Sequence, residues 1–412
     1  MKVSTAILLN KILAVYVGPS GYAVIGQFQN ALAVAASLGG GVVGTGVTKG
    51  TAEHFDDEAR QHAVWKTAFK VSLVATAIAG LTLLLAGPWL SERLLRRLDM
   101  SSIFVWLGLF LPAIVANNLL LAIISGKKEI GIYVAANIIG SLLSLVTVGL
   151  LTFVWGLYGA LLAIAISPAA LVLGTGALVS RRPWFKVRFL WGKIDRPMLR
   201  ELSGFGLMGL TSAITAPLAY MFIRDHLSAS LGLNAAGYWQ ASWKISEIYL
   251  ILLTTTLSIY YLPRLAEIET ARDLRKEILK VYRFVLPVVV TGAIVIFVLR
   301  DFIIHGLFTS EFSPTRDLFP WQLTGDVMKI GSWVLSFIML GRAMVKVFVV
   351  TEITFSISFY LLVRGLIDSF GLPGVAMAYT INYSGYWIVM AFVVQREMRK
   401  MPSGIVAPEN VA

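Results

Sequence analysis

The sequence predicts an all-α membrane protein, with twelve transmembrane helices in two six-helix lobes around a central cavity. Of its 412 residues, 57% are hydrophobic and 14% are charged, and the mean hydropathy is +0.77. Soluble globular domains rarely reach such values. Apolar runs of about 20 residues, the length that crosses a bilayer, recur along the whole chain. The second half of the chain also repeats features of the first half, which predicts two equivalent lobes.

Twelve apolar runs are expected to span the membrane. Met1 leads directly into the first run, so we expect a short first helix and not a secretory signal. The gaps between runs are too short for a separate soluble domain. The expected spans are 1–17, 23–47, 68–89, 103–124, 132–154, 157–179, 203–223, 239–262, 283–304, 321–341, 346–363 and 373–395.

These spans divide into an N-terminal lobe at 1–180, a basic cytoplasmic linker at 181–201, a C-terminal lobe at 202–400 and a cytoplasmic tail at 401–412. The segment Arg264–Arg283 places apolar residues at helical spacing among charged ones. That pattern predicts an amphipathic helix lying on the inner leaflet, with a plain solvated linker as the alternative.

Basic residues set the expected orientation. Most of the 35 Lys and Arg residues fall in loops that lie on one side if both termini are cytoplasmic, as the positive-inside rule requires. We therefore attribute the net charge of +12 to topology, and no nucleic-acid partner is predicted. The chain has no cysteine, which excludes disulfides and thiol catalysis. No two of its histidines have metal-ligand spacing, so neither a metal nor a cofactor is expected. The histidines are His54, His62, His226 and His305.

An internal repeat is visible around two glycine-rich joints. The run Gly156-Leu157-x-Gly159 recurs 215 positions later as Gly371-Leu372-x-Gly374. Six helices per unit is an even number, so the two units run in the same direction through the membrane. Parallel repeats of this kind are typical of transporters that open a central cavity alternately to each side.

Charged residues interrupt the repeat mainly in the second half. Ionisable side chains at membrane depth are costly and by default face a partner, a cavity or a transport path. At the offset of 215, the second half replaces neutral residues of the first by charged ones: Asp326 for Leu111, Lys329 for Ile114 and Glu352 for Asn137.

Residue depth predicts how these charges pair. Lys244 and Glu247 lie in one predicted spanning helix that starts at the outer face, with the base before the acid. Asp326 and Lys329 lie in another such helix, with the acid before the base. Counting about 1.5 Å per residue from the outer face, we expect Lys244 to meet Asp326 and Glu247 to meet Lys329. The alternative is that these residues only form neutralised structural pairs.

The remaining charged candidates also have structural alternatives. Arg224 and Asp225 can snorkel to the outer headgroups, and Lys11, Lys49 and Glu352 can serve as interface anchors. Tryptophans near the predicted span ends are expected to form an interfacial belt. Trp243, beside Lys244, could instead stack on a sugar ring.

Four sequence motifs carry a resemblance to a known family. The chain resembles the polysaccharide flippases of the multidrug/oligosaccharidyl-lipid/polysaccharide exporter superfamily, and is most similar to the Wzx group that serves O-antigen and enterobacterial common antigen. The motifs are Gly46-Val47-Thr48-Lys49, Phe284-Val285-Leu286-Pro287, Leu299-Arg300-Asp301-Phe302 and Arg316-Asp317-Leu318-Phe319-x-Trp321-Gln322-Leu323-x-Gly325-Asp326-Val327-x-Lys329.

The resemblance implies an inner-membrane flippase that moves an undecaprenyl-diphosphate-linked oligosaccharide to the periplasmic leaflet without ATP. It also implies that cavity cations attract the diphosphate and that acids couple an ion gradient or balance charge. A polysaccharide polymerase and a chain-length regulator are implied as possible partners of a monomeric flippase. The implied diphosphate-binding residues are Lys11, Lys49, Arg224, Lys244 and Lys329. The implied coupling or balancing acids are Glu247, Asp326 and Glu352.

Two other functions remain open from the sequence. A multidrug or organic-cation antiporter of the same superfamily would need a net acidic cavity, whereas the spans here hold at least as many lysines as acids. A membrane O-antigen ligase or polymerase generally has a long outer loop that carries reactive residues, and no outer loop predicted here is long enough.

Overall fold

The computed structural model describes residues 2–41, 43–192 and 194–402, and within these ranges it contains helices and turns but no β-strand. The predicted all-α class is confirmed. The chain divides into two compact units, Met1–Gly237 with Leu307–Thr309, and Tyr238–Gly306 with Ser310–Ala412. We call them unit 1 and unit 2.

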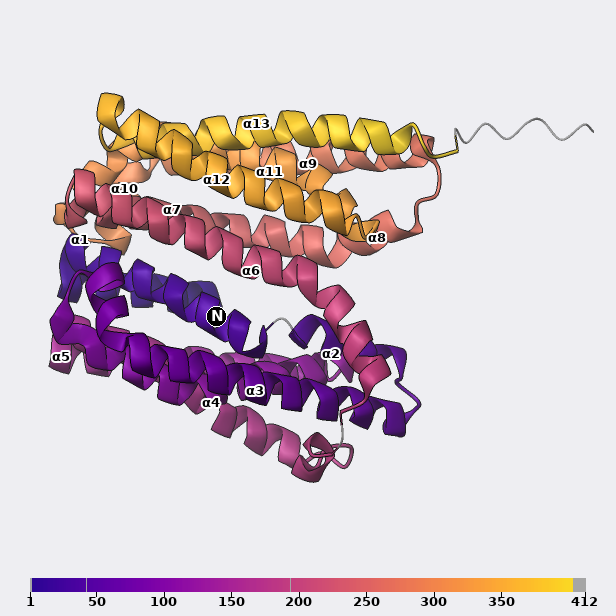
Figure 1. Ribbon diagram of the computed structural model, residues 1–412. Helices are drawn as coiled ribbons and strands as arrows, with labels where there is room; N and C mark the ends of the chain where they lie inside the picture. The colour runs from indigo at the N-terminus through magenta and orange to yellow at the C-terminus, as the bar shows by residue number, and fades with distance from the viewer. Residues whose placement is uncertain (1, 42, 193, 403–412) are drawn as a thin grey trace, which may run out of the picture. The chain divides into compact units, whose positions relative to one another are not determined.

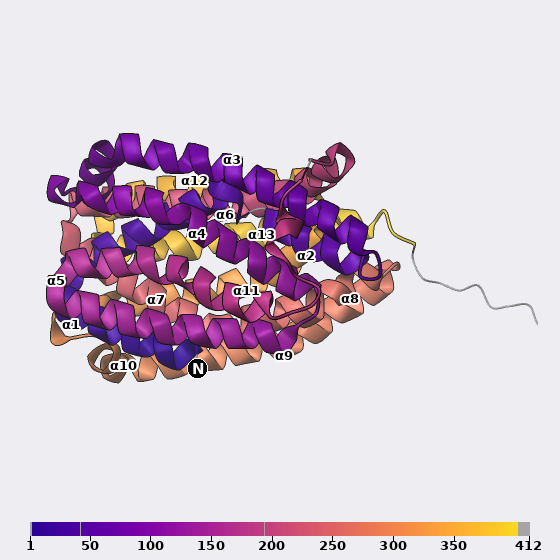
Figure 2. The same cartoon turned by 90° about the horizontal axis from the view of Figure 1, so that it is seen from below.

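The helices of unit 1 lie in the first part of the chain. In Figures 1 and 2, α3 and α4 run alongside each other, and α4 also packs against α5. The elements are α1 Lys2–Ala36, η1 Ser37–Gly41, α2 Val43–Glu53, α3 Glu58–Leu90, η2 Ser91–Leu95, η3 Leu98–Met100, α4 Ser101–Gly126, α5 Ile130–Ser180, η4 Val187–Leu190 and α6 Arg196–Ser230.

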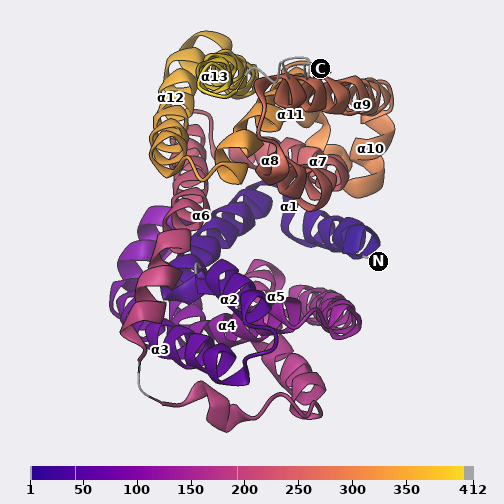
Figure 3. The same cartoon turned by 90° about the vertical axis from the view of Figure 1, so that its right-hand side faces the viewer.

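Unit 2 is built mainly around α11, which packs against α9, α12 and α13. Figure 3 shows α12 and α13 side by side. The elements of this part of the chain are α7 Leu233–Thr256, η5 Leu257–Tyr261, α8 Leu262–Glu267, α9 Ala271–Val298, α10 Arg300–Leu307, η6 Ser310–Leu318, α11 Phe319–Gly341, α12 Val345–Phe370 and α13 Pro373–Met398.

Within the described residues, these helices account for the twelve predicted spans. Eight helical stretches are long and apolar enough to cross a membrane. Two of them, α1 and α5, contain two spans each, because Gly18 and Gly156 have non-helical backbone angles inside them. Figure 3 shows the two segments of α1 running in different directions. The helices α6 and α7, with 35 and 24 residues, complete the set.

The repeat recurs at the level of the backbone. Gly156 has φ 55° and ψ −132°, and Gly371, 215 positions later, has φ 61° and ψ −140°. Lys128 and Ala343, also 215 apart, both have positive φ. The backbone hydrogen bonds around Lys128 recur around Ala343 at the same offset of 215. For example, Lys127 N donates to Ile123 O just as Arg342 N donates to Ile338 O. Both halves therefore use the same joints between helices.

The glycine joint also brings two backbones together. A Cβ atom added to Gly159 would lie 1.8 Å from the carbonyl oxygen of Leu151, and one added to Gly374 would lie 2.6 Å from that of Leu366. These distances are far shorter than any van der Waals contact, and the atoms met belong to the backbone. Each joint therefore depends on a glycine three residues after the break.

Replacing Gly159 by alanine is expected to lower the free energy of unfolding by about 1–3 kcal/mol, since the new methyl group overpacks a tight contact. Thermal unfolding of the purified protein in detergent measures this. Gly365→Ala is the matched control, because a Cβ there meets nothing within 4 Å. That change should stabilise α12 by up to about 1 kcal/mol through helix propensity. Equal behaviour of the two variants would contradict the close approach at Gly159.

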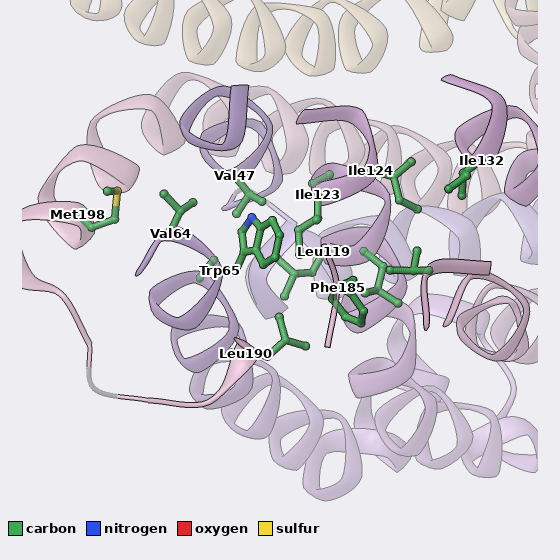
Figure 4. Close-up of a cluster of buried hydrophobic side chains, with 14 residues drawn as sticks. Val47, Val64, Trp65, Leu119, Ile123, Ile124, Ile132, Phe185, Leu190 and Met198 are labelled. Atoms are coloured by element: carbon green, nitrogen blue, oxygen red, sulfur yellow. The ribbon is translucent and has the colours of Figure 1, made fainter. Parts of the chain in front are cut away.

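The linker predicted at 181–201 is part of unit 1 and contributes to its hydrophobic core, and α6 begins inside it at Arg196. Figure 4 shows Trp65 beside Val47, Leu119 and Phe185, and Phe185 comes from the linker. Trp65 is fully buried, and its Nε1 donates to Thr51 Oγ1 at 2.9 Å. The linker is therefore anchored by aromatic packing, although its residues are strongly basic.

Two expectations about local structure are wrong. Arg264–Arg283 is not a separate helix: α8 ends at Glu267, and α9 starts at Ala271 and continues into the membrane span. Thr270 Oγ1 accepts a hydrogen bond from Asp273 N at 3.2 Å and so caps α9. The second predicted span, 23–47, is also interrupted. Its α-helix ends at Ala36, and Lys49 lies in the separate helix α2. Most of the predicted tail, at 403–412, lies outside the described residues.

Candidate substrate-binding site

Arg224 is more deeply buried than Lys11 and Lys49, the other two basic candidates in unit 1. Its side chain is in α6, only 4% exposed, and its Nη1 donates to Gln27 Oε1 at 2.8 Å. The Nε2 of Gln27 donates in turn to the carbonyl of Met221 at 3.2 Å. Gln27 thus bridges α1 and α6 and orients the guanidinium. Snorkelling to the headgroups, the alternative interpretation, does not describe a side chain this buried.

A small pocket of mixed polar and apolar lining lies beside this guanidinium. It has a volume of about 10 Å³, roughly enough for one water molecule. Asp225 closes one side by accepting a hydrogen bond from Arg96 at 2.8 Å, and Arg93 lies 3.8 Å away. A phosphate group could enter only if these contacts rearranged. The lining residues are Ala23, Val24, Gln27, Leu94, Arg96, Arg224, Asp225, Ser228 and Leu233.

Lys11 and Lys49 have different surroundings. Lys11 Nζ donates to the backbone carbonyl of Phe308, and the Phe308 ring packs edge-on against Tyr22 at 5.6 Å between centroids. Lys11 therefore fastens the Leu307–Thr309 segment into unit 1. Lys49 forms an ion pair with Glu53 at 3.2 Å on the same helix, and both side chains are more than 40% exposed. These features fit the alternative role of Lys49 as an anchor at the membrane interface.

Asp326 is the centre of a hydrogen-bond network in unit 2. It lies on α11 and is fully buried. Its Oδ2 accepts from Ser246 Oγ at 2.6 Å and from the Tyr249 hydroxyl at 2.9 Å. Its Oδ1 accepts from the Tyr379 hydroxyl at 2.9 Å, and the Gln322 amide lies 3.5 Å away. One carboxylate therefore ties together residues of α7, α11 and α13.

Lys329, one turn further along α11, is surrounded by aromatic rings. Its Nζ lies 4.8 Å from the ring centroid of Trp243, 5.0 Å from Trp333, 5.5 Å from Tyr383 and 5.9 Å from Tyr379. We call these four rings the Lys329 cage. Trp243 is only 8% exposed, so it is not part of an interfacial belt.

Neither predicted cross-helix ion pair forms as a direct contact among the ion pairs of the described residues. Lys244 Nζ pairs with Glu247 Oε2 on the same helix at 2.8 Å, and it does not pair with Asp326. Glu247 also accepts from Trp243 Nε1 at 3.2 Å, while Lys329 is held by rings. The order of the charges along each helix was read correctly. However, hydroxyl groups compete for Asp326, and a nearer lysine competes for Glu247. Glu352, on α12, is partly buried.

Sequence reasoning missed the neutral partners of Asp326. Gln322 lies four residues before Asp326 and therefore on the same face of α11, and Tyr379 and Tyr383 share one face of α13 in the same way. Polar and aromatic residues at this spacing inside apolar helices were the available signal. Among the described residues, no three His, Asp or Glu side chains gather closely enough to hold a metal ion.

The sequence pattern of the polysaccharide biosynthesis protein family matches residues 4–269. The chain is 30% identical over 387 residues to the lipid III flippases of Escherichia coli K12 and Shigella flexneri, covering 94% of this chain and 93% of each relative. Its fold is similar to that of a multidrug resistance MATE family transporter of the MOP superfamily, solved in an inward-facing conformation. The TM-score is 0.81 at 16% identity, covering 98% of this chain and 96% of that one. The twelve-helix, two-lobe fold is thereby confirmed.

Proposed function

The chain belongs to the polysaccharide biosynthesis protein family, and we propose that it translocates an undecaprenyl-diphosphate-linked oligosaccharide from the cytoplasmic to the periplasmic leaflet. The protein is a multi-pass membrane transporter. The observation that carries the proposal is the relation to lipid III flippases over 94% of the chain. A repeat unit of O-antigen or of enterobacterial common antigen is the proposed cargo.

The physical need for basic side chains inside the membrane supports this cargo. An isolated diphosphate cannot enter hydrocarbon, because its desolvation is prohibitive. Arg224 and Lys329 lie within long helices of units 1 and 2, where they can offset that penalty. We propose that Lys11, Lys49, Arg224, Lys244 and Lys329 attract the anionic cargo, and Arg224 has the strongest geometric support because it is buried and oriented by Gln27.

The acidic residues have a complementary proposed role. Asp326, Glu247 and Glu352 are proposed to balance the cavity cations while no cargo is bound, and to couple transport to an ion gradient. Asp326 lies one turn before Lys329 on α11, and Glu247 accepts a hydrogen bond from Trp243, whose ring also faces Lys329, which supports a shared electrostatic role. By this scheme the cargo replaces the acids as the partner of the cations.

The cellular setting follows from the same reasoning. We propose a monomer in the bacterial inner membrane, with both termini cytoplasmic and with a polysaccharide polymerase and a chain-length regulator as partners. The excess of Lys and Arg in loops on one side supports this orientation. From the sequence repeat we also propose lobes at 1–180 and 202–400, joined by the linker at 181–201, whereas the boundary between the two compact units lies later, after Gly237.

Reconstitution into liposomes tests the function. The cargo is a fluorescent undecaprenyl-diphosphate-linked oligosaccharide, and an impermeant oxidant reaches only the outer leaflet of the liposome. Purified protein is expected to speed the movement of the cargo out of that leaflet, relative to protein-free liposomes. Proton and sodium gradients applied separately identify the coupling ion. Ethidium uptake in the same vesicles tests the organic-cation antiporter. Ethidium transport without oligosaccharide movement would overturn the proposal.

A further inference from the structure

The outward face of the first turns of α9 contains an open pocket, separate from the Arg224 pocket and from the Lys329 cage. It has a volume of about 440 Å³ and belongs to unit 2. Its lining residues recur at helical spacing, so they share one face of α9. They are Lys276, Leu279, Lys280, Arg283 and Phe284. We call this pocket the α9 groove.

The opposite face of α9 holds the helix in place. Leu274 and Val285 are at most 3% exposed, and α9 packs against α11. The groove side is open by contrast: the side chains of Lys276 and Lys280 are 65% and 68% exposed, and Phe284 is 63% exposed. A ligand can therefore enter the groove without any repacking of the helix.

The α9 groove carries a surplus of positive charge. The first fourteen residues of α9 contain five basic and two acidic side chains, which leaves a formal net charge of +3. Asp273 lies 3.7 Å from Lys276 Nζ, and Glu277 lies 4.0 Å from Lys280 Nζ. Both distances exceed that of a hydrogen bond. No ion pair found among the described residues includes Arg283. The cations of the groove can therefore donate to an added anion.

Beyond the groove, the same face of α9 becomes apolar. Phe284 begins this stretch, and Val288, Val295 and Val298 follow it as exposed residues at helical spacing. We call these four residues the α9 stripe. Because α9 is one of the eight stretches long and apolar enough to cross a membrane, its exposed apolar side chains face acyl chains. The groove therefore lies where the headgroups of the bilayer meet its hydrocarbon.

A phospholipid of net negative charge matches both parts of this surface. Its phosphate matches the three cations, and an acyl chain matches the stripe. A zwitterionic lipid would bring its own cation into a basic groove, and free phosphate would leave the stripe unused. Basic clusters beside a spanning helix attract anionic lipids of the cytoplasmic leaflet, and the groove faces that leaflet in the proposed orientation.

We propose that the α9 groove binds the headgroup of an anionic phospholipid, with one acyl chain along the α9 stripe. Lys276, Lys280 and Arg283 donate to the phosphate oxygens, and Phe284 contacts the start of the chain. The bound lipid fastens the first turns of α9 at a fixed depth in the membrane. This site is separate from the proposed cargo path and does not depend on the flippase function.

Native mass spectrometry of the detergent-purified protein tests the site, with phosphatidylglycerol and phosphatidylethanolamine of identical acyl chains as probes. Each cation beside an anionic lipid should strengthen binding about fivefold, so wild-type protein is expected to prefer phosphatidylglycerol by roughly a hundredfold. The groove variant, with Lys276→Gln, Lys280→Gln and Arg283→Gln together, should lose this preference and bind phosphatidylethanolamine as before. Lys280→Gln alone should weaken phosphatidylglycerol binding about fivefold.

A matched variant separates the groove from general charge. The linker variant, with Arg181→Gln, Arg182→Gln and Lys186→Gln, loses the same three charges from exposed side chains of unit 1. It should keep the preference. Phe284→Ser should weaken phosphatidylglycerol binding, whereas Phe302→Ser, at a position 77% exposed on α10, should not. Thermal unfolding shows that each variant is folded.

Three results would overturn the proposal. Equal weakening by the groove and linker variants would mean that the protein attracts anionic lipid only through its overall charge. Displacement of phosphatidylglycerol by inorganic phosphate would make the groove a site for a free anion. Tighter binding of undecaprenyl diphosphate than of phosphatidylglycerol, lost in the groove variant, would make it a loading site for the cargo. Since none of these measurements involves transport, failure of this proposal leaves the proposed function standing.

Discussion

Arg224→Ala is expected to lower the rate of oligosaccharide translocation by about tenfold to a hundredfold, the equivalent of the 1.5–3 kcal/mol that a hydrogen bond to a charged group contributes. The guanidinium is 4% exposed and oriented by Gln27 Oε1 at 2.8 Å. The variant therefore loses a fixed cation in α6. Liposome translocation measures the rate, and surface-polysaccharide assembly at an unchanged protein level measures the consequence in cells.

The control must separate lost charge from lost packing. Arg224→Lys keeps the charge but not the planar guanidinium, and it should retain more transport than Arg224→Ala. Gln27→Ala removes the group that orients Arg224 while leaving its charge, so it should give an intermediate rate. Thermal unfolding of each variant shows whether the protein is folded. Normal polysaccharide assembly in folded Arg224→Ala would refute a role for this cation in binding the cargo.

The architecture was predictable because each spanning helix needs a long apolar run, and this chain contains twelve. The equivalent joint inside each half was also visible, since Gly156 and Gly371 mark the same backbone break. The start of α9 was missed even though the sequence contained a signal. Thr270 and Asp273 form a helix cap there, and no glycine or proline follows until Pro287, which already lies among the apolar residues.

The site was predictable in composition but not in pairing. Counting residues along a helix gives the depth of each residue in the membrane. It placed Asp326 and Lys329 at about the same depth as Lys244 and Glu247 of α7. It does not give rotation about the helix axis, and it ignores neutral groups that compete for a charge. Ser246 and two tyrosine hydroxyls satisfy Asp326, while aromatic rings surround Lys329. Such partners become visible only when the side chains of three helices are placed together.

Asp326→Ala is expected to be the most destabilising single change in unit 2. It removes the acceptor of the Ser246, Tyr249 and Tyr379 hydroxyls at once. Each buried donor left without an acceptor costs about 1–3 kcal/mol, so the loss should reach several kcal/mol. At about 2–4 °C per kcal/mol, the midpoint of thermal unfolding should fall by roughly 10 °C. Glu247→Ala is the matched control, because its side chain is 50% exposed and exposed pairs contribute little.

Asp326→Asn separates the network from the charge. The amide has nearly the same shape, and the three hydroxyls can rotate to donate to its oxygen or accept from its nitrogen. Its unfolding midpoint should therefore lie much closer to that of the wild type than to that of Asp326→Ala. If Asp326 also takes part in ion coupling, then Asp326→Asn should still move cargo but should no longer respond to the coupling gradient in liposomes. A stable Asp326→Ala protein would contradict the network, whereas a stable Asp326→Asn protein that still follows the gradient would exclude Asp326 from coupling.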